Sequence, residues 1–239
     1  MKTTTIEYRD GATLLKGFLA DPQASEVRPA ILVAHEAPGL DDHVKRRSQM
    51  LADLGYVAFA VDMYGEGKVA ANTDEAMAML APVRDDQALL RRRIRAAFDT
   101  LAAMPQVDKS RMAAMGYCFG GMVALELARS GAPTVATVSF HGMLASKTPD
   151  DARNIKGKVL VCTGADDPIV PPEQVQAFQK EMTTAGVDWQ VVCYGGAKHA
   201  FTNPNAAKAG RPALAYNRAA DERSWIAMKD FFAEVFKTP

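Results

Sequence analysis

The sequence has few of the features that assign a chain to a class at once. Its three cysteines among 239 residues are too few and too widely spaced for a disulfide framework, which indicates a reducing compartment. The 28 basic and 28 acidic side chains cancel, so nothing favours nucleic acid or an anionic membrane as a partner. No apolar run approaches the roughly 20 residues that span a bilayer, and no hydrophobic signal core opens the chain. We therefore expect a cytoplasmic monomer or homodimer without nucleic-acid or membrane partners.

Repeats, low-complexity segments and long linkers are also missing, so we expect one α/β domain over residues 1–239. Apolar strand patterns alternate with helical patterns, which predicts a mostly parallel sheet with helices on both faces. The strand patterns lie at 30–34, 57–61, 111–115, 134–140, 158–163 and 189–194, and the helical patterns at 42–54, 73–80, 84–104, 122–128, 172–185 and 221–236. Two further strands, at 3–8 and 13–19, predict an N-terminal antiparallel hairpin. The arginine-rich helix 84–104 predicts a solvated face.

The most informative stretch is the run Gly-Tyr-Cys-Phe-Gly-Gly at residues 116–121. A nucleophile between glycines at a strand-to-helix turn is typical of the nucleophile elbow of α/β-hydrolases, whose sharp turn requires small neighbours. Cys118 is therefore the candidate nucleophile, and the positive end of the following helix favours its thiolate. The backbone N–H of Phe119 would face the oxyanion. A free cysteine is often only a small buried hydrophobe, which is our interpretation of Cys162 and Cys193 inside strand patterns.

A base and an acid follow the candidate nucleophile in the chain. A thiol nucleophile needs a base, and the base needs an orienting carboxylate. His199 lies in a glycine-flanked loop after the last strand pattern, and Asp166 and Asp167 follow the strand before it. The order nucleophile, acid, histidine matches that of α/β-hydrolases. The residues alone leave the acid open, since either aspartate could instead cap its loop through an Asx-turn.

The loop His-Glu-Ala-Pro-Gly-Leu at residues 35–40 follows the third strand pattern, where this fold supplies a second oxyanion N–H. The N–H of Ala37 is the candidate donor. Glu36 would then lie beside the nucleophile, where its charge disfavours a thiolate but its carboxylate could accept the thiol proton when substrate binds. The alternative is that Glu36 only pairs with a cation such as Arg84 or Lys45.

Together these segments resemble the dienelactone hydrolase family (carboxymethylenebutenolidases), cysteine-dependent members of the α/β-hydrolase fold. The resemblance runs from about residue 3 to residue 236 and includes Leu-Gly-Tyr at 54–56, Asp-Met-Tyr at 62–64, Gly-x-x-Asp-x-x-Val-Pro at 164–171 and His-x-Phe at 199–201. It implies a triad of Cys118, Asp167 and His199, with Glu36 taking the thiol proton. It implies hydrolysis of a small-molecule lactone or ester through an acyl-thioester, without metal or organic cofactor.

One family feature is missing from the sequence. The dienelactone enzymes hold the substrate carboxylate with arginines, but residues 64–68 and 199–203 contain none. We therefore expect neutral esters and lactones to compete well with carboxylated ones. Tyr64, His141 and Phe201 are the candidate pocket residues. The alternatives are a general esterase or thioesterase of the same fold, and a non-catalytic scaffold that binds a ligand, which would predict a broken triad.

Overall fold

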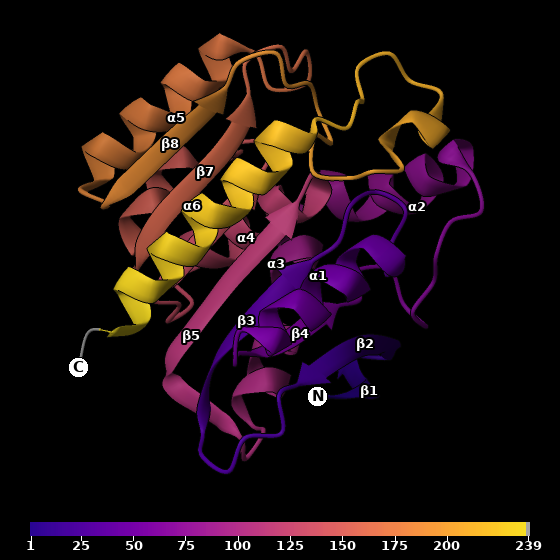
Figure 1. Cartoon of the computed structure of the whole chain (residues 1–239), viewed down its shortest axis with the longest axis vertical. Coiled ribbons are helices and arrows are strands. Elements are labelled where there is room, and N and C mark those ends of the chain that lie inside the picture. Colours follow the sequence, from indigo (N-terminus) through magenta and orange to yellow (C-terminus); the bar gives the residue numbers. More distant parts are fainter. Residues whose placement is uncertain (238–239) are drawn as a thin grey trace.

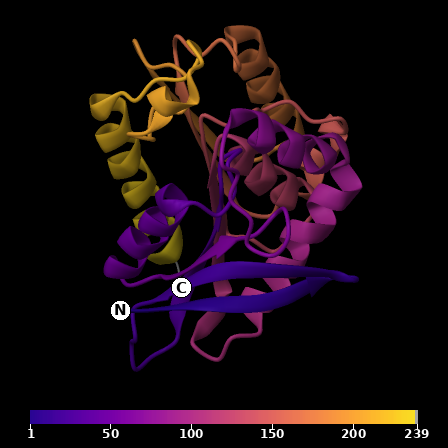
Figure 2. The same cartoon turned by 90° about the vertical axis from the view of Figure 1, so that its right-hand side faces the viewer.

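The alternating pattern forms one eight-stranded sheet between two layers of helices (Figures 1 and 2). The computed structural model describes residues 1–237. The strands are β1 (Lys2–Asp10), β2 (Thr13–Asp21), β3 (Arg28–Ala34), β4 (Val57–Val61), β5 (Val107–Tyr117), β6 (Ala136–Phe140), β7 (Lys158–Gly164) and β8 (Trp189–Tyr194). Across the sheet they lie in the order β1-β2-β4-β3-β5-β6-β7-β8. β1 and β2 pair antiparallel, while β3 to β8 are parallel to one another. The expected fold class is confirmed.

The helices divide between the two faces of the sheet. They are α1 (Asp42–Asp53), α2 (Thr73–Asp85), α3 (Gln87–Ala102), α4 (Phe119–Arg129), α5 (Pro172–Ala185) and α6 (Arg218–Lys237). Figure 2 shows α1 and α6 on one side of the sheet and α3, α4 and α5 on the other. Each layer encloses its own apolar core, because strands buried on both faces carry continuous apolar runs. No helix within residues 1–237 is long and apolar enough to cross a membrane.

The second and third helices meet at a different residue from the one expected. The sequence pattern predicts a break near residues 81–83, but α2 continues through Pro82 and the chain bends at Asp86. The backbone of Asp86 is extended there, and its side chain accepts a hydrogen bond from the N–H of Leu89 at the start of α3. An N-cap of this kind outweighs the proline in placing the boundary.

The prediction of a solvated face holds for only part of the arginine-rich helix α3: Arg92 and Arg95 are exposed, but Arg91 and Arg93 are half-buried. Arg91 pairs with Glu126, which is 1% exposed, and Arg93 donates to the carbonyl of Met63 at 2.6 Å. Arg92 pairs with Asp10 of the hairpin at 2.5 Å. These arginines therefore attach α3 to α4, to the hairpin and to the segment after β4.

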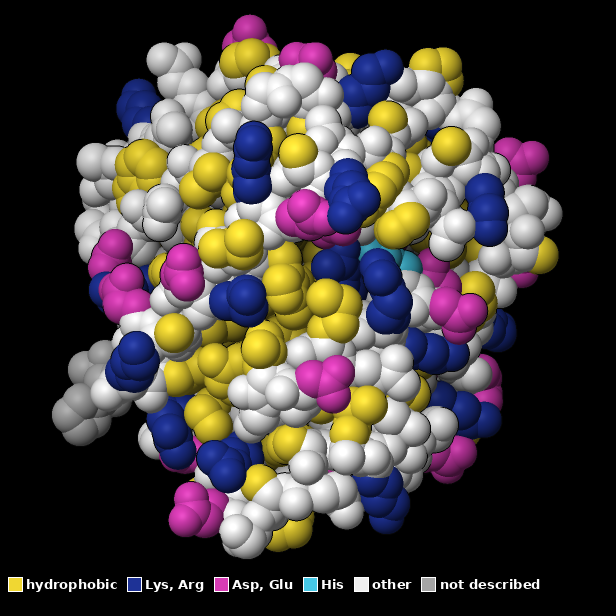
Figure 3. Space-filling model, viewed as in Figure 1, with side chains coloured by type: hydrophobic (Ala, Val, Ile, Leu, Met, Phe, Trp, Pro, Cys, Tyr) yellow, Lys and Arg dark blue, Asp and Glu magenta, His cyan; other side chains and the backbone are white. Residues whose placement is uncertain are grey.

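Over the surface that Figure 3 shows, basic and acidic side chains are interspersed rather than separated by sign.

The parallel strands bring five loops to one edge of the sheet. Ala34 is in register with Gly116, Tyr117 with Phe140, and Gly164 with Tyr194, so β3, β5, β6, β7 and β8 end at similar heights. In open parallel sheets, ligands bind outside the carboxyl ends of the strands. Every candidate site residue lies in these loops or in the loop after β4.

Candidate active site

Cys118 occupies a sharp turn between β5 and α4, with φ 54° and ψ −116°. Residues other than glycine adopt such backbone conformations only when the surroundings enforce them. A side chain at Gly116 would place its Cβ 2.0 Å from the carbonyl oxygen of Gly120, and one at Gly120 would come 2.1 Å from that of Ala34. Glycine is thus required at both positions, and the turn holds the half-buried thiol at the start of the helix.

His199 and Asp167 form a buried pair in which Nδ1 and Oδ2 are 2.8 Å apart. The other oxygen of Asp167 accepts the backbone N–H groups of Ile169 at 2.8 Å and Val170 at 3.2 Å, so the carboxylate is fixed in orientation. Asp166 is exposed, and its backbone N–H donates to the carbonyl of Ala197. Of the two aspartates that the residues left open, only Asp167 meets the histidine.

The charge state of His199 depends on its two neighbours. Burial alone would lower the pKa of His199, but the thiolate of Cys118 and the carboxylate of Asp167 outweigh burial and raise that pKa to about 10. In the described part of the chain, Nε2 of His199 has no hydrogen-bond partner of ordinary geometry. The nitrogen opposite Asp167 is therefore free to exchange a proton with the thiol or with a bound molecule.

Glu36 is 5% exposed and lies at the same cavity as the thiol. Asn203 donates a hydrogen bond from Nδ2 to its Oε2, while its Oε1 has no partner within residues 1–237. Burial raises the pKa of Glu36 to about 7, and the amide of Asn203 only partly opposes this. Arg84 pairs with Asp85, and no ion pair reaches Glu36 in the described residues, so the alternative of a simple ion pair has no support.

The two candidate oxyanion donors lie on the loops that flank the thiol. In residues 1–237, neither the N–H of Ala37 nor that of Phe119 donates to another protein group. Tyr64 fixes both loops: its hydroxyl donates to the carbonyl of Ala37 at 2.8 Å, and its ring stacks on Phe119 with centroids 6.1 Å apart. Two free N–H groups beside a nucleophile can stabilise an oxyanion.

A cavity of about 390 Å³ opens above these groups. Its floor is formed by Glu36, Ala37, Cys118 and His199. Most of the other lining residues are small or apolar. They are Pro38, Asp41, Ala70, Ala71, Asn72, Thr73, Ala76, Met77, Ala200, Asn203, Asn205, Ala206, Lys208, Ala209, Arg211 and Leu214. The walls come from α2 and from the segment after His199. Sequence reasoning missed both walls, although the small residues of 70–76 and 206–209 are a weak compositional signal.

The expected pocket residues lie elsewhere. None of Tyr64, His141 and Phe201 lines the cavity. His141 and Phe201 are fully buried beneath it, with ring centroids 5.0 Å apart, and His141 also packs edge-on against His199 at 5.2 Å. His141 leaves the strand with φ 40°, which turns it away from the cavity that its position after β6 suggested.

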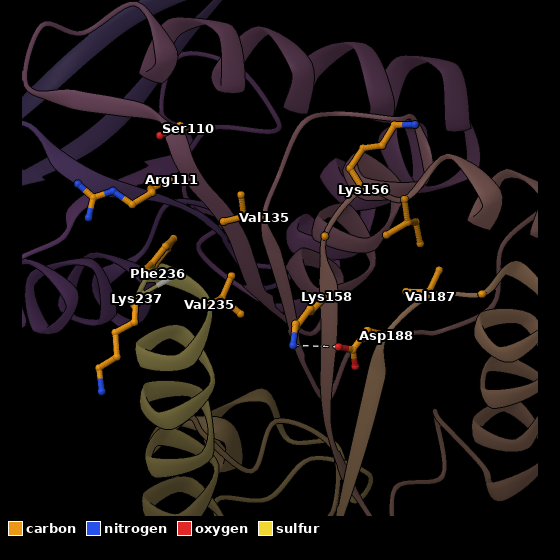
Figure 4. Close-up of a pocket in the computed structure, with 13 residues that line it drawn as sticks. Ser110, Arg111, Val135, Lys156, Lys158, Val187, Asp188, Val235, Phe236 and Lys237 are labelled. Carbon is orange, nitrogen blue, oxygen red and sulfur yellow. Dashed lines mark ion pairs between the residues drawn. The ribbon is translucent and has the colours of Figure 1, made fainter. Parts of the chain in front are cut away.

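A second hollow lies at the opposite edge of the sheet, between the amino ends of β6 and β7 and the end of α6 (Figure 4). It is lined by apolar side chains and several cations, and Lys158 pairs there with Asp188 at 3.0 Å. No histidine or cysteine lines it. Within residues 1–237, no three histidine, cysteine, aspartate or glutamate residues are grouped as a metal site would require.

Comparison with known proteins gives one consistent result. The sequence model of the dienelactone hydrolase family matches residues 15–236. The "Putative carboxymethylenebutenolidase" of Aquifex aeolicus is 30% identical over 205 residues, which cover 83% of this chain and 86% of the relative. Among solved structures, a dienelactone hydrolase-like promiscuous phosphotriesterase from metagenomic libraries is 45% identical, covers 98% of both chains and has a TM-score of 0.95.

Proposed function

The chain belongs to the dienelactone hydrolase family and is a hydrolase of lactones or esters, and we propose that it works through a triad of Cys118, His199 and Asp167. The observation that carries this proposal is the alignment at the cavity floor. A half-buried thiol at a strained turn shares the cavity with His199 and raises its pKa, while Nε2 of His199 is free and Nδ1 is 2.8 Å from a fixed carboxylate. Acyl transfer needs a nucleophile, a base beside it and an acid that orients the base.

Glu36 makes the nucleophile available. When substrate enters, the Glu36 carboxylate takes the proton of the Cys118 thiol, and the thiolate pairs with protonated His199. A pKa near 7 suits this exchange, because the carboxylate can both accept and return a proton at neutral pH. The Asn203 amide holds one oxygen, which leaves Oε1 to receive the proton.

Two acyl-transfer steps follow. The thiolate sulfur attacks the carbonyl carbon, and the backbone N–H groups of Ala37 and Phe119 stabilise the oxyanion. The tetrahedral intermediate collapses to an acyl-thioester as the imidazolium of His199 gives its proton to the leaving alkoxide. Neutral His199 then removes a proton from water, the hydroxide attacks the thioester, and the acid leaves as the thiolate is expelled. Glu36 returns its proton to Cys118.

The cavity favours compact substrates. A volume of about 390 Å³ is at the small end of the range for ligand pockets. Alanine, proline and methionine side chains offer apolar contact, while Asn72, Thr73 and Asn205 are among the polar residues that could hydrogen-bond a small substrate. A small lactone, or an ester with a compact acyl group, fits this environment.

Hydrolysis of a neutral phosphotriester is a second candidate activity. It is favoured by the 45% identity, over 98% of both chains, to the solved promiscuous phosphotriesterase. The thiolate of Cys118 would attack phosphorus and expel an aryloxide, and water would then cleave the phosphorus–sulfur bond. The same two N–H groups would face the phosphoryl oxygen.

One panel tests both activities. Small lactones, p-nitrophenyl esters, acyl-thioesters and an aryl phosphotriester are assayed with the wild type and with Cys118→Ala. Removal of the nucleophile should lower kcat/KM at least ~10³-fold for each true substrate. Cys162→Ala and Cys193→Ala are the matched controls. Cys162 is buried, so its loss should chiefly lower stability, whereas Cys193 is exposed, contrary to the buried position expected of it, and its loss should change little. Wild-type activity in Cys118→Ala would refute the assignment of the nucleophile.

A further inference from the structure

The backbone N–H of Cys118 has two acceptors. It lies 3.0 Å from the carbonyl oxygen of Phe140 and 3.1 Å from Nδ1 of His141. A ring nitrogen can accept a hydrogen bond only when it carries no proton. The proton of the neutral His141 ring must therefore lie on Nε2.

The second ring nitrogen of His141 meets the loop that carries His199. Nε2 is 2.8 Å from Oγ1 of Thr202, and with the tautomer fixed by Cys118 the imidazole donates to that hydroxyl. Thr202 comes three residues after His199, on the same loop. One buried ring thus joins the backbone of the candidate nucleophile to the loop of the candidate base.

Thr202, the partner of His141 in this hydrogen bond, is itself held in place. Arg47 of α1 donates to the carbonyl oxygen of Thr202 at 2.8 Å, and the same guanidinium forms a buried ion pair with Asp221 of α6. Burial lowers the pKa of His141 well below the ordinary value, and the charges of His199, His43 and Arg47 lower it further. The ring therefore stays neutral and keeps Nδ1 available as an acceptor.

We propose that His141 is a positioning residue: it holds the strained backbone of Cys118 and fixes the distance between the Cys118 sulfur and Nε2 of His199. This inference rests on the proposed function, since it assigns those two groups to the chemistry. Cys118 and His141 both have positive φ, at 54° and 40°, and such conformations persist only where several contacts hold them. A displacement of about 1 Å between reacting groups can cost 10²-fold in rate.

Thr202→Val tests the contact without changing the size of the side chain. The hydroxyl that receives the His141 proton is lost, so kcat should fall about 10-fold while KM stays within about twofold, because the cavity lining is unchanged. The pH profile of thiol alkylation by iodoacetamide should shift as well, since the sulfur and imidazole no longer keep their spacing. Thr134→Val is the matched control, because that buried threonine hydroxyl has no partner in residues 1–237 and lies away from the site.

His141→Asn and His141→Ala give a second comparison. Asparagine tolerates a positive φ and keeps an acceptor near Nδ1, so His141→Asn should retain at least about fivefold more kcat than His141→Ala. The proposal is overturned if Thr202→Val keeps the kcat and alkylation profile of the wild type, or if Thr134→Val changes both equally. Cys118→Ala distinguishes failure of the proposed triad from failure of the positioning role of His141. An active Cys118→Ala enzyme would refute the triad. An inactive Cys118→Ala enzyme together with a normal Thr202→Val enzyme would refute only the positioning role.

Discussion

Nδ2 of Asn203 donates a hydrogen bond to Oε2 of Glu36, so the buried carboxylate at the cavity floor meets a neutral amide instead of a cation. A cation in the place of the Asn203 amide would hold the pKa of Glu36 low. With an amide, burial dominates and raises that pKa to about 7. The relation between these two residues leaves Glu36 able to change its protonation at neutral pH, as a group that gates a thiol must.

The first prediction concerns turnover. Glu36→Gln keeps the size of the side chain but cannot accept the thiol proton, so kcat should fall, by about 10²-fold if the carboxylate acts as a general base. The rate at which iodoacetamide alkylates Cys118 in the free enzyme should change as well, because the charge beside the sulfur is gone. Glu26→Gln, at an exposed position, is the control. Unchanged turnover and unchanged alkylation together would make Glu36 a structural residue.

The second prediction concerns stability against pH. The pKa of Glu36 is raised from 4.5 to about 7 on folding, so the carboxyl group stabilises the fold below pH 4.5 and loses that contribution as pH rises through 7. The shift corresponds to about 3 kcal/mol as an upper figure. Glu36→Gln, which cannot ionise, should gain stability relative to the wild type between pH 5 and pH 8. Urea unfolding at pH 5 and at pH 8 measures the free energy of unfolding of both proteins. If the variant and the wild type differed by the same amount at the two pH values, the raised pKa of Glu36 would be contradicted.

The third prediction separates the two aspartates. Asp167→Asn should leave the fold intact but present an amide to Nδ1 of His199, which mis-sets the tautomer and lowers kcat by about 10⁴-fold in comparable triads. Asp166→Asn should cost much less, because that side chain is exposed. The pair is compared by kcat and by melting temperature. The opposite ranking would move the role of acid to Asp166.

Much of the fold and the floor of the cavity could be predicted from sequence, because both depend on local patterns. The elbow requires glycines next to Cys118, and parallel strands bring the loops of Glu36, Asp167 and His199 to one edge. The residues alone leave Asp166 and Asp167 open; the family resemblance implies Asp167, which lies 2.8 Å from Nδ1 of His199.

The walls of the cavity could not be predicted, because they depend on contacts between distant segments. Thr73 at the start of α2 donates to the carbonyl of Ala209, 136 residues later in the chain, and no periodic pattern encodes such a contact. The place of His141 beneath the cavity could not be predicted for a related reason: a residue after a strand at the carboxyl edge can face the cavity or turn beneath it. Its positive φ decides the matter and is not written in the residue type. The half-buried Arg91 and Arg93 of α3 could not be predicted, because their partners Glu126, Asp10 and Met63 lie on other elements.

The last prediction concerns the charge of the substrate. No arginine or lysine lies among the floor residues of the cavity, which supports the expectation that neutral esters and lactones compete well with carboxylated ones. Lys208 and Arg211 do line the cavity, however, and neither forms an ion pair within residues 1–237. Arg211 approaches α2, where its Nη1 is 4.0 Å from the sulfur of Met77.

The comparison is between a carboxylated dienelactone and its methyl ester. We expect their kcat/KM values to differ by less than about 10²-fold, because exposed cations are screened and contribute at most about 1 kcal/mol each. Arg211→Gln and Lys208→Gln should raise KM for the carboxylated substrate by a few-fold and leave that for the ester unchanged. A ~10⁴-fold preference for the acid that Arg211→Gln abolishes would contradict the expectation: it would show that this arginine grips the carboxylate directly, in the bidentate manner for which the guanidinium is suited.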